Sequence, residues 1–291
     1  MAPIHLVMNF DDNYWALAYT VMRSACLSTK RRKDLVFHLC HIGLSEPHKA
    51  QLGAITSEFG ATILHYEPQS NPAFTALVAR LPVSKRFPAI VYTRLLLDRF
   101  LPETVERFIY LDCDTLVRRP IEELYDTDLK GAPIAAVADP YHDGLKLGRD
   151  LKTNKTPFDP ADPYFNSGVL LVDRKAFAAA DIVGRIEEME RDGLLPQLYF
   201  DQDVLNYIFR EKWLPLNWRF NVMMPRPAHE TMGPAILHYT MFRHPWNPWS
   251  GAAFERTYRH VMTNAVFHQY LRERLRRRLP GPLQFLIGAK S

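Results

Sequence analysis

The sequence predicts an α/β protein with a doubly wound sheet. Short apolar runs typical of buried strands alternate with segments of helical spacing, and polar clusters recur directly after several of these runs. Of 291 residues, 47% are hydrophobic and 23% are charged, as in a soluble globular protein with one large domain or two small ones. Neither a G-x-G-x-x-G fingerprint nor a Walker motif occurs, so a dinucleotide fold and a P-loop NTPase are unsupported.

The expected elements of the first half follow in order. Residues 4–10 form a buried strand, 14–28 a helix and 35–42 a second strand. A helix follows at 45–60, with Ser45 as its capping residue and Gly60 as its stop, and residues 61–68 form the third strand.

The second half continues the alternation. We expect a helix at 88–102, the fourth and fifth strands at 108–112 and 132–139, a strand at 165–174, a helix at 200–209 and a late strand at 235–240. In such sheets ligands bind beyond the carboxyl ends of the strands. Polar residues recur at these positions, in the cluster DDNY (residues 11–14), at Asp112 and Asp114, at Asp139 and at His238.

Asp112 and Asp114 form a D-x-D pattern at the end of an apolar run. Alternate residues of an extended segment share a face, so both carboxylates can hold a hard divalent cation. His238 could complete a set suited to Mn²⁺. The alternatives are a solvated acidic turn and a core histidine satisfied by backbone groups.

Two further motifs have a functional and a structural interpretation. FDQDVLN places Asp201, Gln202 and Asp203 at a helix start, where they orient sugar hydroxyls or serve only as an acidic first turn. YFNSGVLLVDR places Asn166 before Ser167 and Gly168, where the glycine permits close backbone approach or forms an ordinary turn into a strand.

Taken together, these blocks resemble glycosyltransferase family 8, and above all the bacterial lipopolysaccharide galactosyl- and glucosyltransferases. The similarity covers roughly the first 250 residues. It is carried by six blocks in the family's order: DDNY, VYTRLLL (91–97), FIYLDCDTLVRRPIEELYDTDL (108–129), YFNSGVLLVD (164–173), FDQDVLN (200–206) and LHYTMFRHPW (237–246).

The resemblance implies a glycosyltransferase-A fold, with a Rossmann-like mixed sheet flanked by helices. It also implies hexose transfer with retention from UDP-galactose or UDP-glucose to an oligosaccharide or glycolipid acceptor, such as lipopolysaccharide core or another surface glycan, and no nucleic-acid partner. Asp112, Asp114 and His238 would hold Mn²⁺, with Mg²⁺ as the alternative.

The resemblance also assigns the remaining site residues. Asp11, Asn13 and Tyr14 would line the uridine pocket, with Tyr14 stacked on the base. Five residues would surround the donor sugar: Arg94, Asp112, Asn166, Asp201 and Gln202. Cys113 would line the same pocket. Asp139 would lie near the sugar and the acceptor. Asp139, Asp201 and Gln202 are the candidate catalytic residues, together with a cation discussed next.

One block departs from the family pattern. After the metal histidine the family usually has H-x-x-G-x-x-K-P-W, whereas this chain has HYTMFRHPW. Met241 stands at the glycine position and His244 at the lysine position, with Arg243 before it. We expect Arg243, whose charge needs no pKa shift, or His244 as imidazolium, to supply the cation that faces the diphosphate.

Other functions remain open. A glycogenin-like protein would glucosylate its own tyrosine. A nucleotidyltransferase also uses paired carboxylates, but it releases pyrophosphate from a nucleoside triphosphate. A binding module would hold a UDP-sugar without turnover.

The chain divides into a catalytic domain, residues 1–250, and a basic C-terminal tail, residues 251–291. The tail carries +6 and the remainder −2. Its stretch from Val266 to Gly288 mixes basic residues with apolar ones, which favours an amphipathic helix on an anionic membrane; the alternative is a solvated helix packed on the domain. These residues are Arg272, Arg274, Arg276, Arg277 and Arg278 with Phe267, Tyr270, Leu271, Leu275, Leu279, Phe285 and Leu286.

The sequence predicts a cytoplasmic protein, peripheral to the inner face of the cytoplasmic membrane. Three scattered cysteines give no disulfide framework. The N-terminus lacks the basic lead of a signal peptide, and no stretch is apolar enough to span a bilayer.

Overall fold

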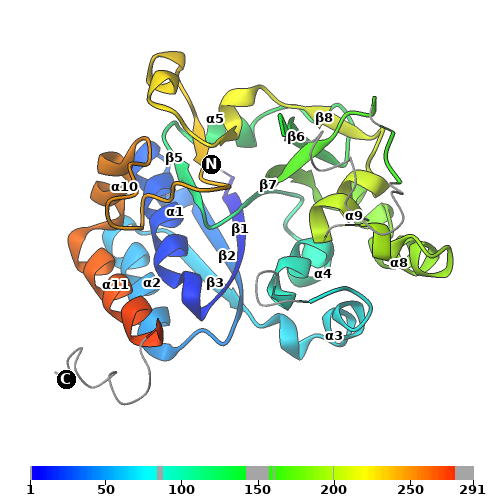
Figure 1. Ribbon diagram of the computed structural model, residues 1–291, viewed down its shortest axis with the longest axis horizontal. Helices are drawn as coiled ribbons and strands as arrows, with labels where there is room; N and C mark the ends of the chain where they lie inside the picture. Colours follow the sequence, from blue (N-terminus) through cyan, green and yellow to red (C-terminus); the bar gives the residue numbers. More distant parts are fainter. Residues whose placement is uncertain (1, 84–87, 142–156, 160, 199, 279–291) are drawn as a thin grey trace.

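The computed structural model describes residues 2–83, 88–141, 157–159, 161–198 and 200–278. Its main sheet has seven strands in the order β3 (Thr62–Tyr66), β2 (Leu35–Ile42), β1 (Ile4–Asp11), β4 (Arg107–Leu111), β7 (Phe165–Asp173), β6 (Ile134–Ala138) and β8 (Trp213–Pro215) (Figure 1). The first four strands of this order, β3, β2, β1 and β4, run parallel to one another, whereas β7 runs antiparallel to both β4 and β6. The expected mixed α/β sheet is therefore confirmed.

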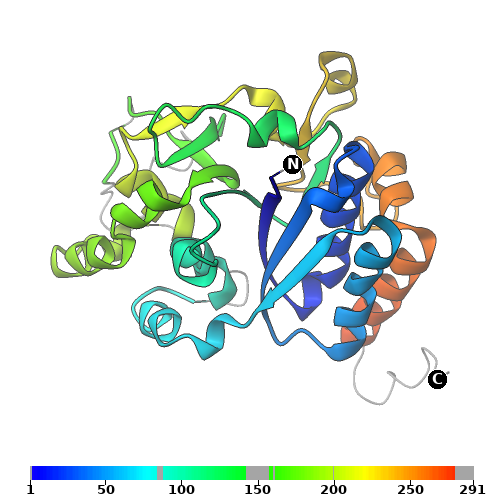
Figure 2. The same ribbon diagram turned by 180° about the vertical axis from the view of Figure 1, so that it is seen from behind.

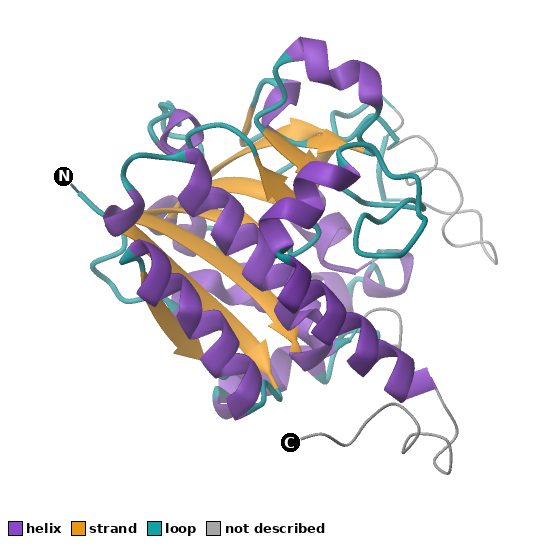
Figure 3. Ribbon diagram, turned by 90° about the vertical axis from the view of Figure 1, so that its left-hand side faces the viewer, coloured by secondary structure: helices purple, strands orange, loops and turns teal. Residues whose placement is uncertain are grey.

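Helices cover both faces of this sheet (Figures 1 and 2). One layer contains α1 (Trp15–Ser28), α2 (Glu46–Phe59), α10 (Glu255–Met262) and α11 (Asn264–Arg278), which lie in front of the strands in Figure 3. The other contains α3 (Pro72–Val78), α4 (Leu97–Phe100), α7 (Arg174–Ala179), α8 (Ile182–Arg191) and α9 (Phe200–Ile208). Each layer buries its own hydrophobic cluster against the sheet, because strands covered on both faces have apolar residues on both.

Short elements complete the fold. A short helix, α5 (Glu122–Tyr125), precedes β6. Short 3-10 helices occur at η1 (Asp12–Tyr14), η2 (Arg32–Asp34), η3 (Pro68–Ser70), η5 (Leu195–Gln197), η6 (Trp218–Phe220) and η7 (Pro227–Met232). The helix α2 begins after Ser45 and ends at Gly60, which adopts φ 73°, as expected for a glycine stop.

One expectation was wrong in detail. The segment expected as one helix at 88–102 is a 3-10 helix, η4 (Ala89–Leu96), followed by the short α4. The side chain of Asn9 donates to the carbonyl oxygen of Ile90 at 2.8 Å, so a tertiary contact to β1 holds this segment in addition to its local hydrogen bonds. The late strand expected at 235–240 is present as β10 (Ile236–His238), which ends at His238 and lies outside the main sheet.

β10 belongs to a second sheet, in the order β5 (Thr115–Val117), β10 and β9 (Val222–Met223). β5 pairs with β10 in antiparallel fashion and places Thr115 opposite His238. This small sheet therefore joins the chain just after Asp114 to the chain that carries His238. Strands of two or three residues are too short for a periodic pattern, and the sequence did not reveal β5, β8 or β9.

The described part of the expected tail packs on the core. Val266, Phe267 and Tyr270 of α11 are buried in the same cluster as α1, whereas Arg272, Arg277 and Arg278 are exposed. Phe267 and Tyr270 are therefore not available to a lipid surface, and Leu279, Phe285 and Leu286 lie outside the described residues. The boundary at residue 250 stays a prediction. Among the described helices, none combines the length and apolar composition needed to cross a bilayer.

Candidate active site

A cavity of about 770 Å³ opens at the carboxyl ends of β1, β4 and β6. Asn166 and Ser167 also reach it, because β7 is antiparallel and its first residues lie at this edge. The cavity brings together most of the residues expected from the sequence: Asp11, Asn13, Tyr14, Arg94, Asp112, Cys113, Asp114, Asp139, Asn166, Asp201, Gln202 and His238. Arg243 and His244 are not among the described residues that line it.

Asp112, Asp114 and His238 form a compact group with one ligand atom each, all within 4.8 Å of one another. The imidazole Nε2 of His238 lies 3.1 Å from Asp114 Oδ1 and 3.8 Å from Asp112 Oδ2. Within the described residues this is the one such cluster of three potential metal ligands. Two carboxylates and an imidazole suit a divalent cation such as Mn²⁺.

A hydrogen bond orients the ring of His238 through the nitrogen that faces away from the two carboxylates. Its Nδ1 lies 2.9 Å from Asn221 Oδ1, which leaves Nε2 facing the two carboxylates. Burial alone would lower the pKa of His238, but Asp114 and Asp112 outweigh it, and the pKa is raised above its usual value. No feature of the sequence singles out Asn221.

Gly168 provides the space for this group. A β-carbon at this position would stand 2.2 Å from His238 Cε1 and 2.7 Å from Asp112 Oδ2, which is closer than any van der Waals contact. The backbone is used as well, since the carbonyl oxygen of Gly168 accepts a hydrogen bond from the amide of Asp112 at 2.8 Å. The close backbone approach expected of Gly168 is therefore present.

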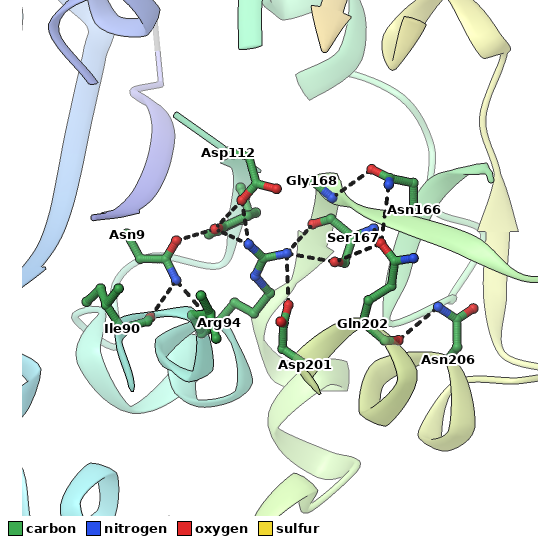
Figure 4. A network of polar contacts seen from close by, with 12 residues as sticks. Asn9, Ile90, Arg94, Asp112, Asn166, Ser167, Gly168, Asp201, Gln202 and Asn206 are labelled. Atoms are coloured by element: carbon green, nitrogen blue, oxygen red, sulfur yellow. Dashed lines mark hydrogen bonds and ion pairs between the residues drawn. The ribbon is translucent and has the colours of Figure 1, made fainter. Parts of the chain in front are cut away.

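Arg94 lies at the centre of a buried polar network beside the metal-ligand group (Figure 4). Its guanidinium donates to Asp112 Oδ1, to Tyr110 Oη at 2.8 Å and to Ser167 Oγ at 2.6 Å, and lies 2.9 Å from Asp201 Oδ2. Burial opposes the charge, but Asp112 and Asp201 raise the pKa of Arg94 above its usual value. Asp112 thus turns one oxygen to Arg94 and the other to His238.

Asp201 and Gln202 lie in the first turn of α9 and approach the cavity from its far side. Burial raises the pKa of Asp201, although Arg94 acts in the opposite direction. The amide oxygen of Gln202 accepts from Ser167 N at 3.1 Å and from Asn166 Nδ2 at 3.2 Å. Figure 4 shows the contacts among Asn166, Ser167 and Gln202. Asn166 Nδ2 also donates to Asp139 Oδ2 at 3.2 Å, which adds Asp139 to the same network.

The turn after β1 forms another wall. Asp11 caps η1 through its own side chain, which accepts from the amide of Asn13 at 2.9 Å. Tyr14 lines the cavity with 48% of its surface exposed, so its ring has a face available to a ligand. Stacking of Tyr14 on a base stays a prediction.

Arg243 and His244 lie in the segment after β10. Arg243 is exposed, and its Nη1 donates to the carbonyl oxygen of Gly251 at 3.5 Å. His244 stacks on Trp246, with ring centroids 4.6 Å apart and planes 5° apart. Burial lowers the pKa of His244, although Asp114 acts in the opposite direction.

Sequence reasoning missed other members of the site. Asn9 accepts a hydrogen bond from the Tyr110 hydroxyl and also lines the cavity. Ser167 meets both Arg94 and Gln202. The only signal for Asn9 was a buried amide two residues before Asp11, within an otherwise apolar strand.

A sequence model of Glycosyl transferase family 8 matches residues 5–250. Over 281 residues the chain is 27% identical to General stress protein A of Bacillus subtilis (strain 168), covering 89% of this chain and 93% of that protein. Over 280 residues it is 23% identical to lipopolysaccharide 1,3-galactosyltransferase of Salmonella typhimurium (strain LT2), covering 90% of this chain and 78% of that protein.

The crystal structure of galactosyltransferase LgtC, in complex with donor and acceptor sugar analogues, has the same fold. The TM-score is 0.68 at 24% sequence identity, covering 89% of this chain and 95% of that one. The expected glycosyltransferase-A fold is thereby confirmed. Since the family's sequence model spans most of the chain, from the first strand to the segment after His238, this protein belongs to glycosyl transferase family 8.

Proposed function

We propose that this glycosyltransferase moves a hexose from UDP-galactose or UDP-glucose, with retention at the anomeric carbon, to a glycan acceptor such as lipopolysaccharide core or another surface glycan. One observation carries the proposal: the Asp112, Asp114 and His238 group and the Arg94 network lie side by side in one cavity and share Asp112. A nucleotide sugar needs such a pair of neighbouring sites, one for the diphosphate and one for the sugar. The lipopolysaccharide acceptor is suggested by the Salmonella relative.

The residues present fit a divalent cation. The donor set is two carboxylates and an imidazole, the free imidazole nitrogen is oriented by Asn221, and Gly168 leaves the space that a β-carbon would fill. Asp112, Asp114 and His238 would hold Mn²⁺ or Mg²⁺. Such a cation, when bound, stabilises the negative charge that develops on a departing diphosphate.

Different side chains of the protein would contact the uridine and the sugar of the donor. Asp11, Asn13 and Tyr14 would hold the uridine at the turn after β1. Arg94, Asn166, Asp201 and Gln202 would orient the sugar hydroxyls, with Asp139 beside them. Because the Gln202 amide is neutral and both its ends are hydrogen-bonded, we assign it to orientation of the sugar rather than to nucleophilic attack.

The acceptor side of the proposal includes a membrane. The exposed basic side chains of α11 suit an anionic surface at the cytoplasmic face. Because Phe267 and Tyr270 are buried, this contact depends mainly on charge, with Leu275 as the exposed apolar side chain of the helix.

The deciding experiment measures UDP release across a panel of UDP-sugars, with Mn²⁺ or with EDTA, and with and without oligosaccharide acceptors. We expect release that needs both metal and acceptor, and a product with the anomeric configuration of the donor by NMR. Asp114→Asn should lower turnover by on the order of 10² or more. Full activity in EDTA contradicts the metal assignment. Hexose added to the protein itself, seen by intact mass, supports the glycogenin-like alternative, and UDP-sugar binding without release supports a binding module.

The membrane contact needs its own test. Truncation after Tyr270 would also remove Glu273 and Arg274, whose side chains bind His48 and Asn247 in the folded protein. Replacing Arg272, Arg276, Arg277 and Arg278 together by Gln is therefore the sharper variant. It should lose binding to phosphatidylglycerol vesicles at low salt, and failure of the unaltered protein to bind them contradicts the idea.

A further inference from the structure

Three segments far apart in the sequence meet behind the turn after β1. His48 of α2 lies with its Nδ1 2.6 Å from Asp12 Oδ1 and its Nε2 3.2 Å from Glu273 Oε1. We name this Asp12, His48 and Glu273 cluster the carboxylate clasp. Carboxylates only accept hydrogen bonds, so a ring nitrogen of His48 that carries a proton donates to the carboxylate it faces. The clasp thereby connects η1, α2 and the C-terminal helix α11, which lies beside α2 (Figures 1 and 2).

The clasp is a built interaction and not a chance surface pair. His48 is 8% exposed, and its ring stacks on buried Trp15 with centroids 4.5 Å apart. The Trp15 Nε1 donates to Glu273 Oε2 at 3.0 Å, and Gln269 donates to Glu273 Oε1 at 3.0 Å. Both oxygens of Glu273 are therefore engaged. A carboxylate removed from water in this way is retained only when hydrogen bonds replace its hydration.

The charges of the clasp agree with its geometry. Burial alone would raise the pKa of Glu273, but hydrogen bonds from Gln269, Trp15 and His48 outweigh it and hold the pKa below its usual value. Burial alone would also raise the pKa of Asp12, but its contacts with Ser45 and His48 outweigh this effect and lower the pKa below its usual value. Both acids are thus held as carboxylates at neutral pH.

The clasp also has a direct connection to the cavity. Asp12 begins η1, and its neighbours Asp11, Asn13 and Tyr14 all line the cavity. The Asp12 carboxylate accepts a second hydrogen bond, from the amide of Ser45 at 2.9 Å. Asp12 is therefore held against the start of α2 from one side and against α11, through His48, from the other. Its neighbours are left free to face the cavity.

We propose that the carboxylate clasp makes α11 part of the nucleotide-binding site, with Glu273 as a positioning residue for the turn at residues 11–14. This inference rests on the proposed UDP-sugar function, because the turn is assigned there to the uridine. A positioned turn binds nucleotide without first losing conformational freedom, so loss of the clasp weakens binding. The chemical step is unaffected, because Glu273 touches neither the Arg94 network nor the metal-ligand group.

Glu273→Gln tests this with the smallest change, since it keeps the shape of the side chain and removes its charge. We expect the Kd of UDP and the KM of the donor to rise by on the order of tenfold, the effect of one lost charge-assisted hydrogen bond, with kcat within about twofold of the unaltered protein. Glu211→Gln, the same change at an exposed residue after α9, is the matched control. The pair Glu273→Gln and Asp12→Asn should be non-additive, because each variant breaks the same clasp.

A second readout does not depend on the nucleotide. Hydrogen exchange of the free protein should become faster at the amides of Asn13 and Ser45 in Glu273→Gln and stay unchanged in Glu211→Gln. An unchanged UDP affinity in Glu273→Gln, or a fall in kcat as large as the loss of affinity, overturns the inference. If the unaltered protein fails to bind UDP, the proposed function is wrong. In that case the hydrogen-exchange rates still test whether the clasp holds the turn at residues 11–14 in place. Unchanged rates at Asn13 and Ser45 in Glu273→Gln would show that it does not.

Discussion

The imidazole Nδ1 of His238 lies 2.9 Å from the side-chain oxygen of Asn221, and this contact determines which ring nitrogen faces Asp112 and Asp114. An amide oxygen only accepts, so Nδ1 carries a proton. The orientation of Asn221 is itself determined, because its Nδ2 donates to Asn166 Oδ1 at 2.8 Å. Asn166 in turn donates to Asp139, a carboxylate that only accepts. A chain of hydrogen bonds therefore runs from Asp139 through Asn166 and Asn221 to His238.

The first prediction concerns Asn221. Asn221→Ala removes the partner of His238 Nδ1, so the ring loses its orientation and Mn²⁺ affinity should fall by about 10- to 100-fold. Calorimetry with Mn²⁺ in the presence of UDP measures this, and Asn264→Ala, at an exposed amide, is the control. If both variants bind Mn²⁺ within about twofold of the unaltered protein, Asn221 has no part in orienting the ligand.

Gly168→Ala is the second prediction. The added β-carbon would stand 2.2 Å from His238 Cε1, so the histidine or the strand must move. We expect a loss of stability of about 1–3 kcal/mol from overpacking and, since displaced groups react poorly, a loss of turnover on the order of 10²-fold. Gly53→Ala is the matched control, because Gly53 lies in α2 and, apart from its chain neighbours and the nearby backbone of the helix itself, no described atom comes within 4 Å of the place that a β-carbon would occupy there.

Gly53→Ala should be neutral or stabilising by up to about 1 kcal/mol, as expected for alanine in a helix. Thermal unfolding and UDP release, measured on both variants, separate the two positions. Equal behaviour of the two glycine variants would show that the space at Gly168 is not needed.

The sequence revealed the elements in which a pattern of apolar residues repeats over several turns of a helix or several residues of a strand. The strand at 35–42 has the expected bounds, and the helix at 45–60 differs only at its ends. The site residues could be found because ordered motifs follow strand ends. What the sequence could not reveal depends on distant pairing: Asn221 meets His238 only because β9 and β10 are neighbours, and Glu273 meets His48 only because α11 returns to α2. No local pattern encodes such contacts.

The third prediction concerns the sugar side of the cavity. Asp201→Ala and Gln202→Ala should lower transfer by on the order of 10²-fold with little change in UDP affinity, because these residues meet Arg94 and Asn166 and not the turn at residues 11–14. Calorimetry with UDP is compared with initial rates. Equal losses in both would show that the residues are structural.

The fourth prediction is a loss of stability in acid. Burial, with His5 beside it, lowers the pKa of His38 to about 4, and burial with His65 and Lys49 nearby lowers that of His41 to about 4. Unfolded histidine has a pKa near about 6.5, so the unfolded chain binds more protons below that pH. Their contribution to stability is therefore present above a pH of about 6.5 and is lost as the pH falls toward 4.

Urea unfolding at pH 6 and pH 5 measures this loss, which should be on the order of 1 kcal/mol for each histidine. His38→Gln keeps hydrogen-bonding groups beside His5 and Tyr66 and should reduce the difference between the two pH values, whatever its stability at pH 7. His268→Gln, at an exposed histidine of α11, should leave the difference unchanged. The same difference in all three proteins would rule out His38.

The last prediction decides between Arg243 and His244 as the cation for the leaving diphosphate. Burial lowers the pKa of His244, so before substrate binds its imidazole is neutral above neutrality, whereas Arg243 is charged at every working pH. Arg243 is exposed, and the described structure holds it through a long 3.5 Å hydrogen bond to Gly251, so its side chain can turn toward the cavity that nearby Met241 lines. Arg243→Ala should therefore lower turnover far more than His244→Ala, Arg243→Lys should restore much of it, and the rate should stay flat from pH 7 to pH 9. Initial rates of UDP release over this range provide the measurement. A histidine acting as the cation would lose its charge as the pH rises through its pKa. A rate that falls in this way, together with a nearly silent Arg243→Ala, would assign the role to His244.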